Sequence, residues 1–359
     1  MTGKGFREIR ISMDEKLTTR GSGIAALDAA TRFPAVFAYQ ENGGYRVERR
    51  EMTLAELPDA DVLVDVAYSS LNYKDGLAVT GRGKIVRTFP MVLGIDLAGT
   101  VVESRSELYK PGDRVLGIGQ SLSETSWGGY SGYQRVRPDI LIPVPERFSL
   151  AEAMAIGTAG FTAMLCVMGL EHQEVLPESG PVVVTGAGGG VGSFAVALLA
   201  GLGYEVVAST GRSEIHEHLR RLGAASFVSR SELETAGPAL QSARWAGGVD
   251  TVGGAILASV ISQTRYGGAV AACGMAASSE LHVSVFPFIL RNVALLGTSS
   301  SATSRPKRLA GWERLARDLP AEALARIAPR TEPMSRIFDV AEEIMTGRVL
   351  GRVVIDVKS

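Results

Sequence analysis

A glycine-rich loop with the sequence AGGGVG, at residues 187–192, restricts the fold of this 359-residue chain more than any other feature. It follows a valine run at 182–184 and opens a stretch of small apolar residues that predicts a helix over 190–202. Minimal side chains at Ala187, Gly189 and Gly192 allow a tight turn, close approach of a pyrophosphate and close packing of helix on strand. The loop therefore predicts a dinucleotide-binding unit. The alternative is an ordinary helix N-terminus in an α/β core.

Strand and helix patterns alternate after this loop. Strands are predicted at 182–185, 205–209, 226–228, 249–252, 268–273 and 294–297, and helices at 190–202, 214–222 and 255–264. Such alternation is typical of a doubly wound parallel sheet with right-handed crossovers. We therefore expect a Rossmann nucleotide-binding domain over residues 157–303.

A different pattern precedes residue 157. Short β-rich runs alternate with turn signals between residues 33 and 156, which predicts a mostly antiparallel β domain. An apolar strand at 352–357 ends the chain, and we expect residues 304–359 to complete this first domain. Residues 1–32 mix charges with Gly, Ser and Thr without a period, so they are interpreted as an N-terminal extension, mobile in part.

Charge and composition exclude several classes of function. The 37 Lys and Arg residues nearly balance the 38 Asp and Glu residues and form no basic cluster, so we expect no nucleic-acid partner. Uncharged stretches at 153–170 and 181–204 are long enough to span a membrane, but their glycines favour core elements. Cys166 and Cys273 lie in apolar sequence, which is typical of buried thiols in a cytoplasmic protein.

The residue types needed for several chemistries are missing from the sequence. The four His and two Cys residues have no metal-ligand spacing, so we expect no metal site. There is also no Gly-x-Ser-x-Gly nucleophile elbow and no Walker loop. Hydride transfer by a bound cofactor remains as the chemistry that the glycine-rich loop supports.

The end of the second predicted strand distinguishes NAD from NADP. An acidic residue there would bond the ribose 2′-hydroxyl, whereas this chain has Thr210, Gly211 and Arg212, with Arg230 further on. A guanidinium suits a 2′-phosphate, so the sequence favours NADPH. The alternative is that Arg212 is a solvated residue that caps a loop.

Several motifs carry a family resemblance. They are SSLNYKD at 69–75, FPMVLGIDLAGTV at 89–101, WGG at 127–129, GTAGFTAM at 157–164, WAG at 245–247 and PFILRNV at 287–293. Together they resemble the medium-chain dehydrogenase/reductase superfamily, and within it the zinc-free AcuI/YhdH group of acryloyl-CoA reductases, also described as quinone oxidoreductases. Zinc-dependent members carry a Cys in the first motif and His-Glu after the Gly of the second, and both are absent here.

This resemblance implies a GroES-like fold for the β domain and NADPH-dependent reduction of acryloyl-CoA to propionyl-CoA. Hydride would add to the β-carbon and leave an enolate on the thioester oxygen, and the α-carbon would then be protonated. Asn72 and Tyr73 are the expected catalytic residues. Tyr73 would touch the nicotinamide end and donate a proton, or else it only packs beneath the cofactor.

The resemblance also implies a set of cofactor contacts. They are Tyr73, Gly188, Gly189, Gly190, Val191, Thr210, Gly211, Arg212, Arg230, Met275, Ile289, Ser300 and Arg352. Alternatively, Met275 and Ile289 are core residues and Arg352 is a surface charge. Lys84 and Arg87 would meet the phosphates of coenzyme A or lie on a solvated face.

Three functions remain open on the sequence. The leading one is the acryloyl-CoA reductase, with an acyl-CoA thioester as substrate. The second is reduction of quinones or small enones, and the third is NADPH binding without turnover. By analogy with the superfamily, we expect a homodimer formed by the edge strands of two nucleotide domains.

Overall fold

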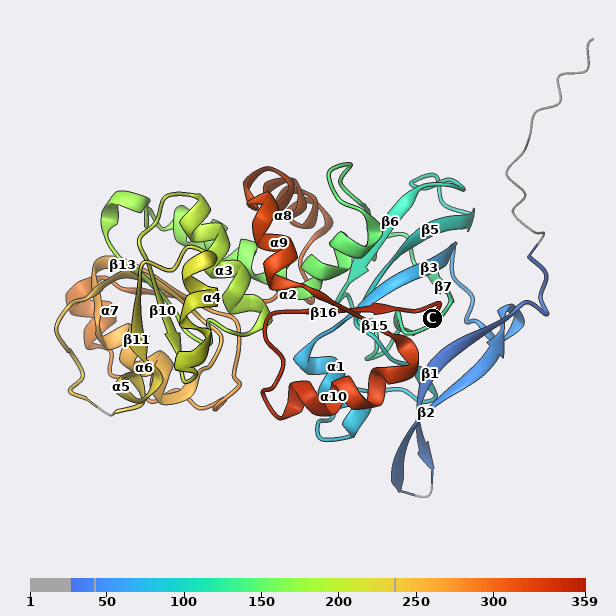
Figure 1. Cartoon of the computed structure of the whole chain (residues 1–359), viewed down its shortest axis with the longest axis horizontal. Coiled ribbons are helices and arrows are strands. Elements are labelled where there is room, and N and C mark those ends of the chain that lie inside the picture. Colours follow the sequence, from blue (N-terminus) through green and yellow to red (C-terminus); the bar gives the residue numbers. More distant parts are fainter. Residues whose placement is uncertain (1–26, 42, 236) are drawn as a thin grey trace, which may run out of the picture.

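The computed structural model describes residues 27–41, 43–235 and 237–359, and these form three sheets (Figure 1). Most of the predicted N-terminal extension, residues 1–26, lies outside the described residues. A six-stranded sheet lies at one end of the molecule and the other two sheets lie at the opposite end. The α/β fold with two kinds of sheet confirms the predicted fold class.

The six-stranded sheet is parallel throughout, with strand order β11-β10-β9-β12-β13-β14. Its strands are β9 (Val182–Val184), β10 (Val206–Thr210), β11 (Ser226–Ser229), β12 (Trp245–Asp250), β13 (Thr264–Ala272) and β14 (Ala294–Gly297). Its helices are α3 (Gly190–Gly201), α4 (His216–Arg221), α5 (Arg230–Glu234), α6 (Gly254–Ser262) and α7 (Phe286–Arg291). The chain order reverses at β9, and a ligand crevice is expected at such a position.

The second large sheet is mostly antiparallel and includes β16, the last strand in chain order. It holds β15 (Arg330–Pro333), β16 (Val353–Asp356), β3 (Val62–Leu71), β5 (Asp96–Ser104), β6 (Arg114–Ile118) and β8 (Leu141–Pro143), with β7 (Tyr133–Val136) beside β3. In the pairing of β16 with β3, Val353 lies opposite Leu71. The C-terminal strand therefore belongs to the sheet of the first predicted domain.

The third sheet contains an element that the sequence reasoning missed. It consists of β2 (Gly44–Thr53), β1 (Arg32–Glu41) and β4 (Met91–Val92). β2 carries Arg46, Glu48, Arg49 and Arg50 and is mostly solvent-facing, so it has no apolar alternation. A polar outer strand is held by its hairpin partner, and composition alone does not predict it.

Helix α2 (Leu150–His172) joins the two large sheets. Its N-terminus has a capping box between Ser149 and Glu152, and it packs against β3, β5, β6 and β16 as well as α3, β12 and β13 (Figure 1). The helix is broken at Gly157, which has φ +48° and ψ −154°. Because α2 packs on both sheets across residue 157, the domain boundaries at 156 and 303 stay predictions.

Helix α2 is also long and apolar enough to cross a membrane by length and composition alone. Its most apolar 18-residue window has a mean hydropathy of 1.8, but 83% of that window is buried inside the protein. The break at Gly157 and this burial are those of a core helix.

Four further helices complete the described structure. They are α1 (Tyr73–Thr80), α8 (Arg305–Asp318), α9 (Ala321–Ile327) and α10 (Ile337–Met345). Short 3-10 turns lie at Leu54–Glu56, Pro177–Ser179, Ser213–Ile215 and Met334–Arg336. The helix predicted over 214–222 therefore begins as a 3-10 turn, and the segment after Asn72 is helical.

Candidate active site

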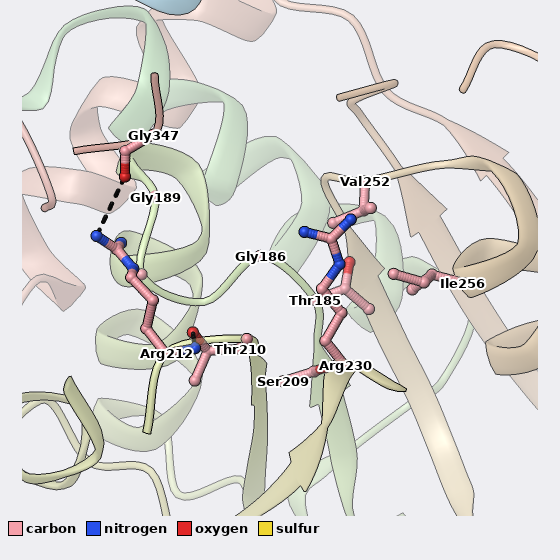
Figure 2. A pocket seen from close by; sticks show the side chains of 12 residues that line it. Thr185, Gly186, Gly189, Ser209, Thr210, Arg212, Arg230, Val252, Ile256 and Gly347 are labelled. Carbon is pink, nitrogen blue, oxygen red and sulfur yellow. Dashed lines mark hydrogen bonds between the residues drawn. The ribbon is translucent and has the colours of Figure 1, made fainter. Parts of the chain in front are cut away.

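A cavity of about 340 Å³ lies beside the glycine-rich loop, at the carboxyl ends of β9 and β10 (Figure 2). Its lining residues are Thr185, Gly186, Gly188, Gly189, Ser209, Thr210, Gly211, Arg212, Arg230, Val252, Ile256 and Gly347. Six of the predicted cofactor contacts are thus brought together: Gly188, Gly189, Thr210, Gly211, Arg212 and Arg230. The cavity occupies the place in a doubly wound sheet where nucleotides bind.

The backbone around this cavity needs its glycines. A Cβ atom at Gly192 would lie 2.3 Å from the carbonyl oxygen of Gly186, so α3 could not pack this closely on the loop. The free amides at the start of α3 face the space that a phosphate would fill, as at other helix N-termini that bind anions. The loop geometry therefore fits a pyrophosphate.

Two arginines flank the far end of the cavity. In Figure 2 the side chains of Arg212 and Arg230 both point away from the end of β10, on either side of it. Arg212 Nη1 donates to the carbonyl oxygen of Gly347 over 3.3 Å, and Arg230 Nε donates to Glu234 Oε1 over 2.7 Å. The described lining residues include no Asp or Glu, so this end of the cavity fits a phosphate better than a free ribose hydroxyl pair.

Arg352 connects the glycine-rich loop with the first sheet. Only 3% of the residue is exposed, so the sequence-based alternative of a surface charge is wrong. Nη1 donates to the carbonyl oxygen of Leu71 and to Asn72 Oδ1, and Nε donates to the carbonyl oxygen of Ala155. Within the described chain, its Nη2 is buried without a hydrogen-bond partner. A Cβ at Gly190 would lie 2.8 Å from Arg352 Cδ, so this cation lies against the loop that would hold the pyrophosphate.

Asn72 and Tyr73 differ sharply in exposure. Asn72 caps the N-terminus of α1 and is 7% exposed, whereas Tyr73, the first residue of α1, is 48% exposed. The amide nitrogen of Asn72 donates within the protein, to Ser70 Oγ, Asp75 Oδ2 and Asp96 Oδ2, at 3.0 to 3.1 Å. Its donors are therefore satisfied internally, and Tyr73 is the residue of this pair whose side chain is accessible to a substrate.

Two buried carboxyl groups lie behind Asn72. Asp75 and Asp96 are fully buried. Burial, together with the charge of Asp96, raises the pKa of Asp75 to about 7. Burial also raises the pKa of the nearby Tyr130 phenol, whose hydroxyl donates to the carbonyl oxygen of Ser70. The segment next to Tyr73 is thus supported by a buried cluster of polar side chains, whose hydrogen bonds depend on the charge state of its carboxyl groups.

The remaining predicted contacts lie outside the lining of the cavity. Met275 is 70% exposed and Ile289 is 75% exposed, so neither is a core residue. The Met275 Cα lies 3.3 Å from where a Cβ of Gly253 would be, next to the cavity residue Val252. Ile289 lies on α7 and does not line the cavity.

Ser300 and Val191 occupy more interior places. Ser300 is 7% exposed and its hydroxyl accepts a hydrogen bond from Thr162 Oγ1 on α2. Val191, in the first turn of α3, is half-buried and packs against the main core. Lys84 and Arg87 are exposed, and Arg87 Nη2 lies 3.6 Å from Glu124 Oε2.

Sequence reasoning missed the buried acids of the site. Asp96 is the only charged residue between 91 and 102, a run of otherwise apolar or small residues, and a lone acid in such a run signals a paired buried charge. Asp250, at the end of β12, likewise accepts from Thr185 Oγ1 and from the backbone amides of Val252 and Gly253. Asp250 fixes the loop beside the cavity, whereas Asp96 fixes the residues before Tyr73 and the break in α2.

Metal-binding side chains are not grouped in the described residues. They contain no cluster of three or more His, Cys, Asp or Glu side chains that would hold a metal ion. Cys166 and Cys273 are free thiols that contact each other, and neither is part of such a cluster. The His, Cys, Asp and Glu side chains of the described residues therefore do not fit a zinc site.

Two family models match the chain. Residues 58–146 match the alcohol dehydrogenase GroES-like domain, and residues 190–315 match the zinc-binding dehydrogenase domain. The second description names zinc, but that concerns the family and not the residues present here. The two matches fall on the mostly antiparallel sheet and on the parallel sheet respectively.

Individual relatives are similar along nearly their whole length. The acrylyl-CoA reductase AcuI of Ruegeria pomeroyi is 50% identical over 322 residues, which are 89% of this chain and 97% of that protein. The yhdH oxidoreductase of Salmonella enterica, solved in complex with NADP, is 46% identical with a TM-score of 0.88, over 90% of this chain and 99% of that one.

A third relative differs in its bound nucleotide. The Bacillus subtilis protein yhfP, solved with NAD bound, is 42% identical with a TM-score of 0.88, over 91% of this chain and all of that one. All three likenesses cover both large sheets and the cavity between the loop and β10. The chain therefore belongs to the medium-chain dehydrogenase/reductase superfamily, within the group that contains AcuI, YhdH and YhfP.

Proposed function

We propose that this protein is an NADPH-dependent reductase of the carbon–carbon double bond of acryloyl-CoA. The proposed substrate rests on the 50% identity with AcuI of R. pomeroyi over 97% of that protein. The cofactor is supported by the pair Arg212 and Arg230 at a cavity end without an acid, and by NADP in the S. enterica relative.

The chain's own residues would contact two phosphate-bearing regions of the cofactor. Gly188, Gly189 and Gly190 would hold the pyrophosphate, with Cδ of Arg352 packed against Gly190. Thr210, Gly211, Arg212 and Arg230, which line the cavity, would surround the 2′-phosphate. Met275, Ile289, Val191 and Ser300 are proposed as further contacts. Bound NADPH supplies the hydride.

Tyr73 is the proposed proton donor. Addition of hydride to the β-carbon moves the π electrons of the double bond onto the thioester oxygen, and the resulting enolate must be protonated at the α-carbon. The half-exposed phenol of Tyr73 lies next to the buried cluster of Asn72 and can give this proton and regain one from water. Asn72 orients the first turn of α1, since its amide nitrogen is fully used inside the protein.

One assay tests this function. Oxidation of NADPH is followed at 340 nm with acryloyl-CoA, free acrylate, a quinone and no acceptor, each also with NADH. We expect turnover with acryloyl-CoA and a preference for NADPH. Turnover with the quinone and none with acryloyl-CoA would overturn the substrate, and no turnover with any acceptor would favour a binding protein.

We propose that the protein acts as a cytoplasmic homodimer. The parallel sheet ends at β14, whose outer edge has no partner strand among the described residues; exposed Leu295 lies on β14 itself and exposed Leu290 on α7, the helix before it. Such an apolar sheet edge is typically covered. Sedimentation at micromolar concentration should give twice the chain mass, and Leu295→Lys should give the monomer; a wild-type monomer would overturn this assembly. Free thiols at Cys166 and Cys273 support the cytoplasm.

A further inference from the structure

Asp96 is the point at which four separate segments of the described chain meet. Its Oδ2 accepts from Ser70 Oγ at 2.6 Å, from Thr158 N at 2.9 Å and from Asn72 Nδ2 at 3.0 Å. Its Oδ1 accepts from Thr158 Oγ1 at 2.6 Å, and Arg352 Nη2 lies 3.9 Å from Oδ2. The hydrogen-bond donors come from the end of β3, the residue that caps α1 and the break in α2, and the ion pair comes from the residue before β16.

The break in α2 at Gly157 makes room for the Asp96 carboxylate. A Cβ at Gly157 would lie 2.6 Å from Asp96 Oδ2 and 2.8 Å from Arg352 Nη2, so the helix can turn here only with glycine. The turn presents both the backbone amide and the hydroxyl of Thr158 to Asp96. Asp96 therefore connects α2, which packs on both large sheets, with the residues that precede Tyr73.

Asn72 lies between two opposite buried charges. Its amide nitrogen donates to Asp96, and its carbonyl oxygen accepts from Arg352 Nη1 at 3.0 Å. This arrangement fixes the orientation of the side-chain amide. A flip would turn its oxygen toward Asp96 and its nitrogen toward Arg352, and both contacts would be repulsive. Asn72 caps α1, so its orientation determines where Tyr73 begins the helix.

We propose that Asp96 is a positioning residue for the reduction, which holds Asn72 and Thr158 so that Tyr73 and the cofactor site keep a fixed relative placement. The inference rests on the proposed active site at Tyr73 and deepens it. Asp96 acts through Asn72, since its carboxylate is fully buried and reaches no substrate. Reacting groups displaced by about 1 Å lose roughly 100-fold in rate, so such support has a measurable effect.

Asp96→Asn tests the charge with the smallest change of shape. The hydroxyl of Thr158 can rotate to accept from the new amide, while the remaining oxygen keeps the donors of Ser70 and Asn72. We expect kcat at saturating NADPH to fall about 10- to 100-fold, while the NADPH dissociation constant stays within about threefold of wild type. The dissociation constant is measured by quenching of protein fluorescence, without substrate.

Asp250→Asn is the matched control. Asp250 is also fully buried and also accepts from a threonine hydroxyl and backbone amides, but it supports the loop beside the cofactor cavity. Its variant should weaken NADPH binding about 10-fold or more, whereas Asp96→Asn should leave the NADPH dissociation constant within about threefold of wild type. Both variants should lower the unfolding temperature, so a loss of stability alone does not explain why only one of them weakens NADPH binding.

Thr158→Val is a second test if Asp96→Asn does not fold. It removes one donor to Asp96 and keeps the charge, and we expect kcat to fall about 3- to 10-fold with unchanged NADPH affinity. The inference is overturned if kcat stays at the wild-type value, or if kcat and NADPH affinity fall together in the variant that folds. Wild-type turnover of acryloyl-CoA separately tests the proposed function; if only a quinone is reduced, the same ratios are measured with the quinone.

Discussion

Removal of the Arg212 guanidinium should change the nucleotide preference of the protein. Arg212 lines the cavity at the end of β10, and the one described hydrogen bond of its guanidinium, to the carbonyl oxygen of Gly347, is long at 3.3 Å. Turning this side chain toward a phosphate therefore breaks little. A charge-assisted hydrogen bond contributes about 1.5 to 3 kcal/mol, which corresponds to roughly 10- to 100-fold in affinity.

Arg230 can compensate for part of the NADPH affinity that is lost when the Arg212 guanidinium is removed. Its side chain is 51% exposed and already paired with Glu234, so it can replace only part of the interaction that Arg212 would make. We expect Arg212→Ala to lower kcat/KM for NADPH about 10- to 100-fold and to change kcat/KM for NADH by less than about threefold. The double variant with Arg230→Ala should lower the ratio further.

The assay compares kcat/KM for the two nucleotides at fixed ionic strength, with the same acceptor. Arg221→Ala is the control, because Arg221 is 66% exposed on α4, pairs with Glu217 and does not line the cavity. An unchanged ratio of NADPH to NADH in Arg212→Ala would refute the placement of the 2′-phosphate. An equal loss with both nucleotides would show that Arg212 serves the loop and not the phosphate.

Three further predictions concern the buried cluster and the residue beside it. Tyr73→Phe should lower kcat about 100-fold or more and leave NADPH affinity nearly unchanged. Stopped-flow kinetics measures the rate of reduction, and a wild-type rate in this variant would show that Tyr73 is not the proton donor. Gly157→Ala should lower the free energy of unfolding by about 2 to 4 kcal/mol in urea titrations, because its Cβ meets Asp96 and Arg352 at a positive φ; a change below about 1 kcal/mol contradicts the packing described. Asp75 has a pKa near 7 in the folded protein, above its unfolded value, so its contribution to stability is full below about pH 4 and is lost as pH rises toward 7. The free energy of unfolding of wild type minus that of Asp75→Asn should therefore fall between about pH 4 and about pH 7, and a constant difference would contradict the raised pKa.

The regular part of the fold was predictable because its signals are local. Valines at 182–184, the small residues at 187–192 and the absence of an acid after β10 lie within one βαβ unit, so one short window contains the argument. The parallel sheet and the cavity residues Gly188, Gly189 and Arg212 followed from it.

The buried cluster was not predictable in the same way. Asp96, Thr158 and Arg352 are separated by 62 and more residues along the chain, and each signal alone is a single polar residue. Arg352 was interpreted either as a cofactor contact or as a surface charge, and only the pairing of β16 with β3 shows that it is buried. Strand β2 was missed for a related reason, since its polar residues depend on a partner strand to become ordered.

The position of β16 next to β3 has a consequence for the order in which the protein is made. Synthesis proceeds from the N-terminus, so every strand of the parallel sheet leaves the ribosome before residues 353–356 do. The strand opposite Leu71 and the guanidinium that holds Asn72 therefore emerge after the glycine-rich loop and its whole sheet. The residues that support Tyr73 are completed later than the parallel sheet beside the cofactor cavity.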